Sequence, residues 1–397
     1  MKKKLLALAL ALTMALGLTA CGGGNDTSAA DDGGSDTTES TGTAFKIGVI
    51  GPLTGGAAIY GTCVANSAQI AVDEINALGG DIQFELLPAA DDVNDAETSV
   101  NAYNSLMDKG MQILVGTVTT QPALSVVPLT YDDRVFTLTP SASGDDVIEN
   151  NDNVFQICFT DSNQGSRSAQ YINEHFPDAK IGIIYKNDEQ YSIGIRDNFK
   201  AEADARGMDI VYEGTFAEAN QTDFNVQLTA AQSAGADLLF LPIYYTPASA
   251  ILTQANALGY KPTFFGVDGM DGILTAKNFD ASLAEGVYLL TPFSADAEDE
   301  MTQNFVTKYQ EAYGETPNQF GADAYDAIYT LYQAIQAAGV TADMSNEEIC
   351  DALIEVMPTI SVTGLTSAGS EMTWDANGAV SKDPTAVIIE NGTYVTP

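Results

Sequence analysis

Short apolar runs alternate along this chain with stretches whose apolar residues recur every three or four positions. The first run is Phe45–Ile50, and the apolar residues between Thr62 and Leu78 then fall on a single helical face that ends at Gly79. An alternation of this kind is typical of parallel strands joined by crossover helices. This alternation restricts the fold class more than the composition does. We expect an α/β fold with doubly wound parallel sheets.

The first half of the pattern predicts three more strands and two more helices. The helix after the second strand is expected to be capped by Asn94, with Glu97 three residues later, and to run to Gly110. The next helix is expected to begin at Pro122, since proline is favoured in the first helical turn. The expected strands are Ile82–Leu87, Met111–Val118 and Val135–Pro140.

The same pattern restarts near Lys180 and predicts a second doubly wound domain. Its expected strands are Lys180–Lys186, Asp209–Tyr212, Ala236–Ile243, Thr263–Asp268 and Val287–Phe293. Its expected helices are Tyr191–Arg206, Asp223–Ala234 and Pro247–Leu258. Three helices follow, at Ala297–Tyr313, Phe320–Ala338 and Asn346–Met357, and then a hairpin-like tail with Met372–Asp375, a turn at Asn377–Gly378 and a strand at Ala386–Val395. We expect these three helices to return and cover the first domain.

The N-terminus reads as a targeting segment that takes no part in the fold. Lys2–Lys4 precede an uncharged apolar run that is too short to span a membrane, which is typical of a secretory signal. Leu18–Cys21 resembles the bacterial lipobox, so we expect a signal peptide over 1–20 and a lipidated Cys21. An ordinary cleaved signal with a chance cysteine is the alternative. Residues 21–44 are rich in Gly, Asp, Ser and Thr and are expected to form a disordered tether.

Charge and cysteine content limit the possible partners. The formal net charge is −38, so nucleic acid and anionic lipid surfaces would repel the chain and we expect no nucleic-acid partner. Cys63, Cys158 and Cys350 show no metal-ligand spacing, and we expect neither a metal nor a cofactor. We interpret these three as buried thiols, with one accidental disulfide as the alternative.

Several motifs, in order and at the right intervals, resemble the branched-chain amino-acid (Leu/Ile/Val) binding protein family, which has the type I periplasmic binding fold and serves ABC importers. The resemblance extends from about Phe45 to the end of the chain. It is carried by Lys46–Gly55, Tyr60–Gly61, Ala71–Gly80, Asp91–Asp92, Gln121–Ala123, Thr139–Ser143 and Thr373–Asp375.

The resemblance implies two lobes, joined by three crossing strands, that close like a hinge over a solute. The crossings are expected near Gln156–Asp161, Leu289–Phe293 and Ser361–Met372. Lobe 1 would then comprise residues 45–158 and 291–362, and lobe 2 residues 159–290 and 363–397. The implied protein is a monomeric, extracytoplasmic lipoprotein, anchored at the outer face of the bacterial cell membrane, that captures an amino acid and delivers it to an ABC permease.

The candidate ligand residues suit a zwitterion, which is costly to desolvate unless both of its charges are paired. Thr119 and Thr120 precede a helix whose N-terminal N–H groups can hold a carboxylate. By resemblance, this loop and the loop Ser141, Ala142, Ser143 contact the carboxylate and the ammonium. Asp268 matches the family's acidic ammonium partner, commonly Glu. The further matches to family contacts are Tyr60, Tyr191, Tyr244 and Phe320.

Each of these residues also has a purely structural interpretation. Asp268 could cap a helix over Gly269–Ala276, the tyrosines could serve packing, and Phe320 could belong to the core. Catalysis is not expected, because the only histidine, His175, reads as a surface residue and no nucleophile elbow, paired-histidine metal motif or phosphate loop is present. The alternatives that remain are a ligand-sensing receptor subunit, or the same fold binding a short amide, urea, an aromatic acid or a sugar.

Overall fold

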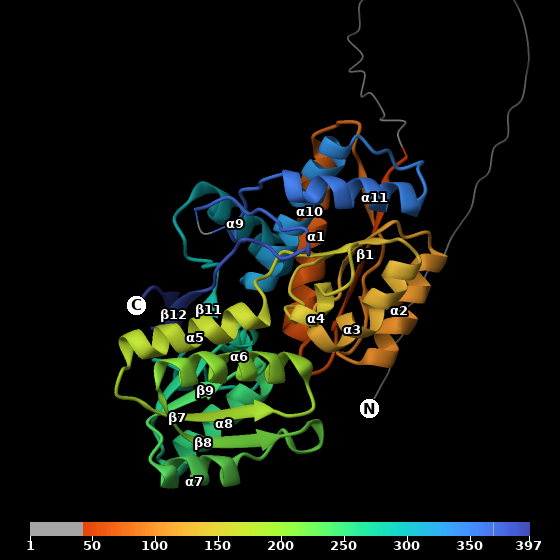
Figure 1. The fold of residues 1–397 in the computed structure, drawn as a ribbon. Helices are drawn as coiled ribbons and strands as arrows, with labels where there is room; N and C mark the ends of the chain where they lie inside the picture. Colours follow the sequence, from red (N-terminus) through yellow and green to blue (C-terminus); the bar gives the residue numbers. More distant parts are fainter. Residues whose placement is uncertain (1–42, 368) are drawn as a thin grey trace, which may run out of the picture. The chain divides into compact units, whose positions relative to one another are not determined.

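The computed structural model describes residues 43–397 except residue 368. The expected signal peptide 1–20, Cys21 and most of the expected tether lie outside the described residues. The described residues belong to one compact unit, which contains two sheets with their helices (Figure 1). Within the described residues, no helix combines the length and the apolar character that a membrane crossing requires.

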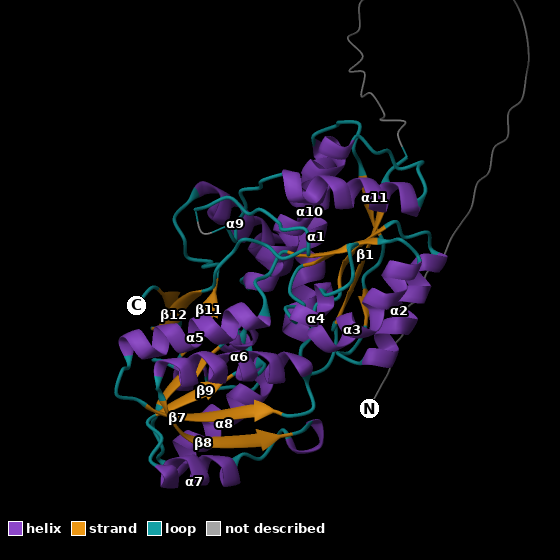
Figure 2. Ribbon diagram, viewed as in Figure 1, coloured by secondary structure: helices purple, strands orange, loops and turns teal. Residues whose placement is uncertain are grey.

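The first sheet has the strand order β2-β1-β4-β5-β6, with β3 also paired to β1, and every pairing is parallel. Its strands are β1 (Phe45–Gly51), β2 (Phe84–Leu86), β3 (Ala90–Asp91), β4 (Ile113–Gly116), β5 (Phe136–Thr139) and β6 (Val154–Gln156). The helices between them are α1 (Ala58–Ala77), α2 (Ala96–Asp108), α3 (Thr120–Asp132) and α4 (Asp145–Ile148). The strands are central, with helices on both sides (Figure 2).

The second sheet has the order β13-β12-β11-β10-β9-β7-β8 and is parallel except for β12 and β13. Its strands are β7 (Lys180–Lys186), β8 (Asp209–Phe216), β9 (Leu238–Leu241), β10 (Thr263–Gly266), β11 (Tyr288–Thr291), β12 (Thr385–Glu390) and β13 (Thr393–Val395). Its helices are α5 (Asp161–His175), α6 (Gln190–Arg206), α7 (Asn225–Ala234) and α8 (Tyr245–Leu258), and short 3-10 turns are η1 (Glu218–Asn220), η2 (Asp268–Met270), η3 (Ile273–Thr275) and η4 (Ala281–Ala284).

The strands of the second sheet are apolar on both faces because helices cover both faces. Successive residues of β9 alternate between them: Leu238 and Phe240 pack with α5 and α6, whereas Leu239 and Leu241 pack with α7 and α8. Such a strand reads as an unbroken apolar run in the sequence, as Leu238–Leu241 does. The predicted pattern of two doubly wound domains is therefore what the structure has.

The chain returns to the first sheet after β11. Helices α9 (Glu300–Tyr313), α10 (Gln319–Ala338) and α11 (Asn346–Val356), followed by the turn η5 (Met357–Thr359), form the return. α10 packs along α1, and α11 contacts β5 (Figure 1). The expectation that three late helices cover the first domain is confirmed. We call the first sheet with α1–α4 and α9–α11 the first domain, and the second sheet with α5–α8 the second domain.

The third crossing lies later in the chain than the sequence predicted. Residues 362–381 stay on the first domain: the Trp374 indole N–H donates to the carbonyl of Gln156 at 2.7 Å, and the Gln156 N–H donates to the carbonyl of Gly378 at 2.9 Å. The chain pairs with the second sheet only from Thr385. The predicted crossing at 361–372, and with it the start of the lobe 2 tail at 363, is therefore placed about twenty residues too early.

Three local expectations also need correction. Asp95, not Asn94, caps α2, because its carboxylate accepts from the Thr98 N–H at 2.8 Å. Helix α3 begins at Thr120, two residues before Pro122. The expected strand 386–395 is a hairpin, since Asn391 and Gly392 have positive φ angles of 55° and 76° and form its turn.

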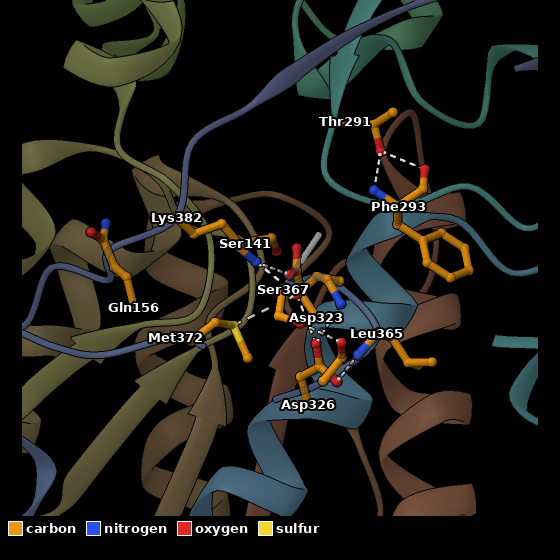
Figure 3. A network of polar contacts seen from close by, with 12 residues as sticks. Ser141, Gln156, Thr291, Phe293, Asp323, Asp326, Leu365, Ser367, Met372 and Lys382 are labelled. Carbon is orange, nitrogen blue, oxygen red and sulfur yellow. Dashed lines mark hydrogen bonds and ion pairs between the residues drawn. The ribbon is translucent and has the colours of Figure 1, made fainter. Parts of the chain in front are cut away.

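A buried ion pair fixes residues 362–382 to α10. The Lys382 ammonium donates to Asp323 at 2.6 Å and to the Thr366 hydroxyl at 2.8 Å, and both charged side chains are almost fully buried. One turn further along α10, the Asp326 carboxylate accepts from the N–H groups of Leu365 and Thr366, each at 2.8 Å. Figure 3 shows Lys382 reaching Asp323 above these contacts. These contacts hold the chain on the first domain up to Lys382, so the third crossing starts after that residue.

We predict that Lys382→Met lowers the free energy of unfolding by about 3–5 kcal/mol, because it leaves the Asp323 carboxylate buried without its cation. Chemical denaturation measures the change. The double variant Lys382→Met/Asp323→Leu should recover most of the loss, since both charges are then removed. A double variant no more stable than Lys382→Met would contradict the assignment.

Candidate functional site

The segments that follow β4 and β5 in the first sheet meet those that follow β9 and β10 in the second across a narrow cleft. Seven of the ten predicted ligand residues line one small space there: Tyr60, Thr119, Ser141, Tyr191, Tyr244, Asp268 and Phe320. Val118 and Gly269 complete its wall. The space measures about 10 Å³, which is the room of about one water molecule. The structure thus brings together residues from seven separate elements or loops at one point, in a closed arrangement.

Three predicted residues lie just behind this wall. The Thr120 hydroxyl accepts from the Gly144 N–H at 3.2 Å, and the carbonyl of Ala142 accepts from the Gln156 amide at 2.9 Å. Ser143 is fully buried, and its carbonyl accepts from the Asp161 N–H at 2.8 Å. Thr120 and Ala142 therefore serve to shape the two loops.

The first domain presents helix-end donors to the cleft. β4 ends at Gly116, whose φ is 151° and where a Cβ would lie 2.8 Å from the Ile50 carbonyl oxygen, so glycine is required for the turn that leads to Thr119. Thr119 precedes α3, its side chain makes no capping hydrogen bond, and its hydroxyl is buried without a partner in the described structure. N–H groups of the first helical turn have no intrahelical acceptors. The start of α3, with its free N–H groups and the Thr119 hydroxyl, is therefore suited to an anion.

The second domain presents Asp268 to the same space. Its carboxylate accepts from the Tyr191 hydroxyl at 2.5 Å and from the Gly269 N–H at 2.7 Å. Burial raises the pKa of the Asp268 carboxyl to about 7. Asp268 does not cap a helix over 269–276, because only the short turns η2 and η3 occur there.

Asp161 and Gln164, on the first turn of α5, are cleft-side residues that the sequence interpretation missed. Asp161 is 1% exposed, and one of its carboxylate oxygens has no hydrogen-bond partner in the described residues. Burial raises its pKa well above the ordinary value, and the nearby Asp268 carboxylate adds to this. The Gln164 side-chain carbonyl accepts from the Asp268 N–H at 3.2 Å, while its NH₂ has no acceptor in that same region. In the sequence, Asp161 follows the helix cap Thr160, and an acidic residue in the first turn of a helix is common, so nothing there distinguishes Asp161 as a cleft residue.

A third buried carboxylate, Glu189, lines a separate small space on the other side of Tyr244. It is 4% exposed and 3.7 Å from the Lys186 ammonium, which itself pairs with Glu218 at 2.6 Å. Burial raises the pKa of Glu189, although Lys186 opposes the rise. Asp161 and Asp268 are therefore the buried carboxylates of this side of the cleft that have no cation beside them among the described residues, whereas Glu189 has Lys186.

Aromatic rings form the remaining wall. Tyr191 stacks on Tyr244 with ring centroids 4.7 Å apart, and the ring of Tyr60 lies edge-on to Tyr244 and to Phe320. A Cβ at Gly269 would lie 2.5 Å from the Tyr191 hydroxyl oxygen, so glycine is required beside this stack. The rings make the space apolar away from its charged ends.

Hydrogen bonds from one domain to the other close the cleft. The Tyr60 hydroxyl donates to the Gly269 carbonyl and accepts from the Tyr245 N–H at 3.2 Å. The Thr246 hydroxyl donates to the Gly56 carbonyl at 2.6 Å. A solute larger than water can therefore enter only after these contacts open.

In the described part of the chain, no group of three or more His, Cys, Asp or Glu side chains could hold a metal ion. Cys63, Cys158 and Cys350 are buried and unpaired there.

Comparison with known proteins identifies relatives over most of the chain. The family described as "Periplasmic binding protein" matches residues 44–383. The Leu/Ile/Val-binding protein BraC3 of Rhizobium johnstonii is 30% identical over 75% of this chain and 81% of its own length. A protein of Pseudomonas aeruginosa described as a leucine-, isoleucine-, valine-, threonine- and alanine-binding protein is 27% identical over 78% of this chain and 82% of its own.

Solved structures agree with the architecture. The branched-chain amino-acid transporter substrate-binding protein LivJ of Streptococcus pneumoniae, in complex with isoleucine, has a TM-score of 0.78 and 28% identity, covering 89% of this chain and 100% of its own. A solute-binding protein of R. palustris in complex with benzoate has a TM-score of 0.77 at 18% identity, covering 89% of this chain and 95% of its own. The latter establishes the likeness in fold alone.

We predict that Asp268→Asn becomes more stable, relative to the parent chain, as the pH rises. Because burial raises the Asp268 pKa above its unfolded value, the folded chain holds a proton that the unfolded chain has lost between about pH 4 and pH 7, and stability falls as pH rises through that range. Between pH 5 and pH 8 the stability difference should change by about 2–3 kcal/mol in favour of Asp268→Asn.

Urea denaturation at the two pH values measures this difference. The exposed Asp178→Asn serves as the control and should show no such change. A difference for Asp268→Asn that is equal at pH 5 and pH 8 would mean that the Asp268 carboxyl is not desolvated.

Proposed function

We propose, from the premise that this chain belongs to the periplasmic binding protein family, that it captures an amino acid with an apolar, branched or similar side chain and delivers it to an ABC importer. The observation that carries the proposal is the set of buried polar atoms without partners around one small space. They include the Thr119 and Ser143 hydroxyls on the first domain, and an Asp161 oxygen and the Gln164 amide on the second.

A zwitterion would satisfy both kinds of group. Its carboxylate would accept from the Thr119 hydroxyl and from N–H groups at the start of α3, where the helix dipole also favours an anion. Its ammonium would lie against Asp268, with Asp161 close by. Each charge would then be paired when the cleft excludes water, which is the condition for burying it at tolerable cost.

The aromatic wall supports an apolar side chain on the solute. Tyr60, Tyr191, Tyr244 and Phe320 offer ring faces and edges, and among the residues that the structure describes, Asp268 is the only acidic or basic one that lines the small space itself. A simple aromatic acid such as benzoate would bring a carboxylate and no ammonium. The buried carboxylates Asp161 and Asp268 would then remain unpaired, so this alternative fits less well.

The closing contacts suggest the order of events. Solute would bind to one domain while the Tyr60–Gly269 and Thr246–Gly56 contacts are open, and closure would add the contacts of the other domain. The closed form is favoured by the contacts that only it makes with the solute. A micromolar affinity requires a net gain of about 8 kcal/mol.

We predict that a thermal-shift screen of the chain without its signal will identify an apolar amino acid, with branched-chain members prominent. Solute at a hundred times its dissociation constant adds about 2.7 kcal/mol of stability, which gives a clear shift. The panel also contains small amides, urea, sugars, benzoate and 4-hydroxybenzoate. A response to benzoates and none to amino acids would replace the proposal with an aromatic-acid binder.

Calorimetry on variants then tests the ammonium site. Asp268→Ala should weaken binding of the amino acid at least tenfold, because the ammonium loses its buried partner. The exposed Asp178→Ala removes the same charge far from the cleft and should bind as the parent does. Unchanged affinity in Asp268→Ala would refute the role of Asp268.

The lipid anchor is a separate part of the proposal. Cys21 follows a short apolar run and a small residue, and we propose that it carries the lipid that holds the protein at the outer face of the membrane. We predict that metabolic labelling with a fatty acid marks the parent chain and that Cys21→Ser abolishes the label. Cys63→Ser is the matched control, and label that persists in Cys21→Ser would exclude lipidation at this residue.

A further inference from the structure

A second, much larger cavity lies between the two domains. It measures about 670 Å³, within the range of 300–1,000 Å³ that is usual for small-molecule sites. The first domain contributes the start of α1, the residues after β11 and the loop 314–318, and the second domain contributes residues 271–275 and 392–394. The solute cleft described above is closed to about 10 Å³, so this cavity offers far more room for an organic molecule.

The cavity and the solute cleft share one short stretch of chain. Asp268 faces the cleft, and Asp271, three residues later, lines the cavity. The Asp271 N–H donates to the Asp268 carbonyl at 2.8 Å. Gln319 contacts both positions, because its backbone N–H donates to the Asp271 carboxylate at 2.8 Å and its side-chain amide to the Asp268 carbonyl at 3.4 Å. A molecule bound in the cavity would therefore act on the backbone that positions Asp268.

Contacts between the domains also meet at this wall. Ile59 lines the cavity and precedes Tyr60, whose hydroxyl donates to the Gly269 carbonyl. A Cβ at Gly272 would lie only 2.9 Å from a methyl carbon of Ile59, so the two domains touch closely here. The cavity has its present shape only while these contacts hold.

The chemistry of the wall selects a class of occupant. One part is apolar and includes Ile59, Leu274, Phe293 and Pro317. The charged residues on the wall are Asp271, Asp296 and Glu315, and no Lys, Arg or His is present among the described residues that line it. The Asp271 carboxylate is almost fully buried and already accepts from the Gln319 N–H, the Gly272 N–H and the Tyr394 hydroxyl, so the charge open to an occupant is that of the exposed Asp296 and Glu315. An anion would be repelled, whereas a compact apolar body carrying an ammonium group would match both parts.

We propose that this cavity is a second binding site, for a small organic amine with an apolar body, and that its occupation favours the closed form. An occupant that contacts both domains in this arrangement binds the closed form better than the open one. By reciprocity, it must then raise the affinity for the amino acid in the cleft by the same factor. This coupling rests on the proposed function, but binding in the cavity itself does not.

The test uses three probes of similar size: phenethylamine, 2-phenylethanol and phenylacetate. Calorimetry is performed on the full chain without its signal, carrying Asp268→Ala so that the cleft lacks its ammonium partner. We expect phenethylamine to bind one-to-one, 2-phenylethanol to bind several-fold more weakly, and phenylacetate to give no binding. No binding of the amine up to about 10 mM, or phenylacetate binding equal to that of the amine, would overturn the site.

Two variants locate the binding. Ala295 is half-buried on the cavity wall, and Ala295→Trp places an indole in the space, so the amine should lose at least tenfold in affinity. Asp296→Asn with Glu315→Gln leaves the volume unchanged and should remove the preference for amine over alcohol. Amine binding that Ala295→Trp does not alter would place the amine elsewhere and overturn the proposal, and circular dichroism verifies that each variant is folded.

The coupling is measured with the parent chain and the amino acid found in the screen. Saturating phenethylamine should lower the dissociation constant of the amino acid about fivefold or more, and Ala295→Trp should abolish this effect. Equal constants with and without the amine would refute the coupling. A chain that binds phenethylamine and no amino acid would instead refute the proposed function and leave the cavity site standing.

Discussion

The pairing of buried carboxylates determines how the parts of this protein are held together and where it can take up a charge, because a charge inside a folded chain must be paired or neutralised. At Asp323 the chain supplies the cation itself, as Lys382, and the pair fixes the segment that leads into the second sheet. Around Asp161 and Asp268 it supplies hydroxyls and amides, and the nearby cation Lys186 pairs instead with Glu189 and Glu218. The first arrangement is complete within the molecule. The second is suited to receive its positive charge from outside.

The fold could be predicted from the sequence because each strand and helix carries its own pattern. The run Leu238–Leu241 is apolar on both faces, and the late helices show one apolar stripe that requires a sheet to cover. The third crossing could not be placed in this way. Its position depends on the contacts of Trp374 with Gln156, 218 positions away, and of Lys382 with Asp323, 59 positions away, and such long-range pairings leave no periodic trace in a single sequence.

The candidate site was predicted in part, and the missed residues have a common reason. Thr119 and Asp268 follow strand ends, where ligands of open α/β sheets usually bind, and Tyr60 lies in the first turn of α1, the helix after β1. Asp161 and Glu189 stand at helix starts, where an acidic residue has an ordinary explanation in capping and the helix dipole. Only burial and the missing hydrogen-bond partner of Asp161 distinguish its role, and both are properties of the assembled structure.

The order in which the chain visits its two domains has a consequence for folding. The first domain is not covered until α10 and α11 are available, and the second sheet gains β12 and β13 only from the last residues, so neither domain is complete before nearly the whole chain has been made. Premature compaction of the first half is thereby disfavoured during synthesis. Such a delay suits a polypeptide that must cross a membrane as an extended chain and acquire its structure on the far side.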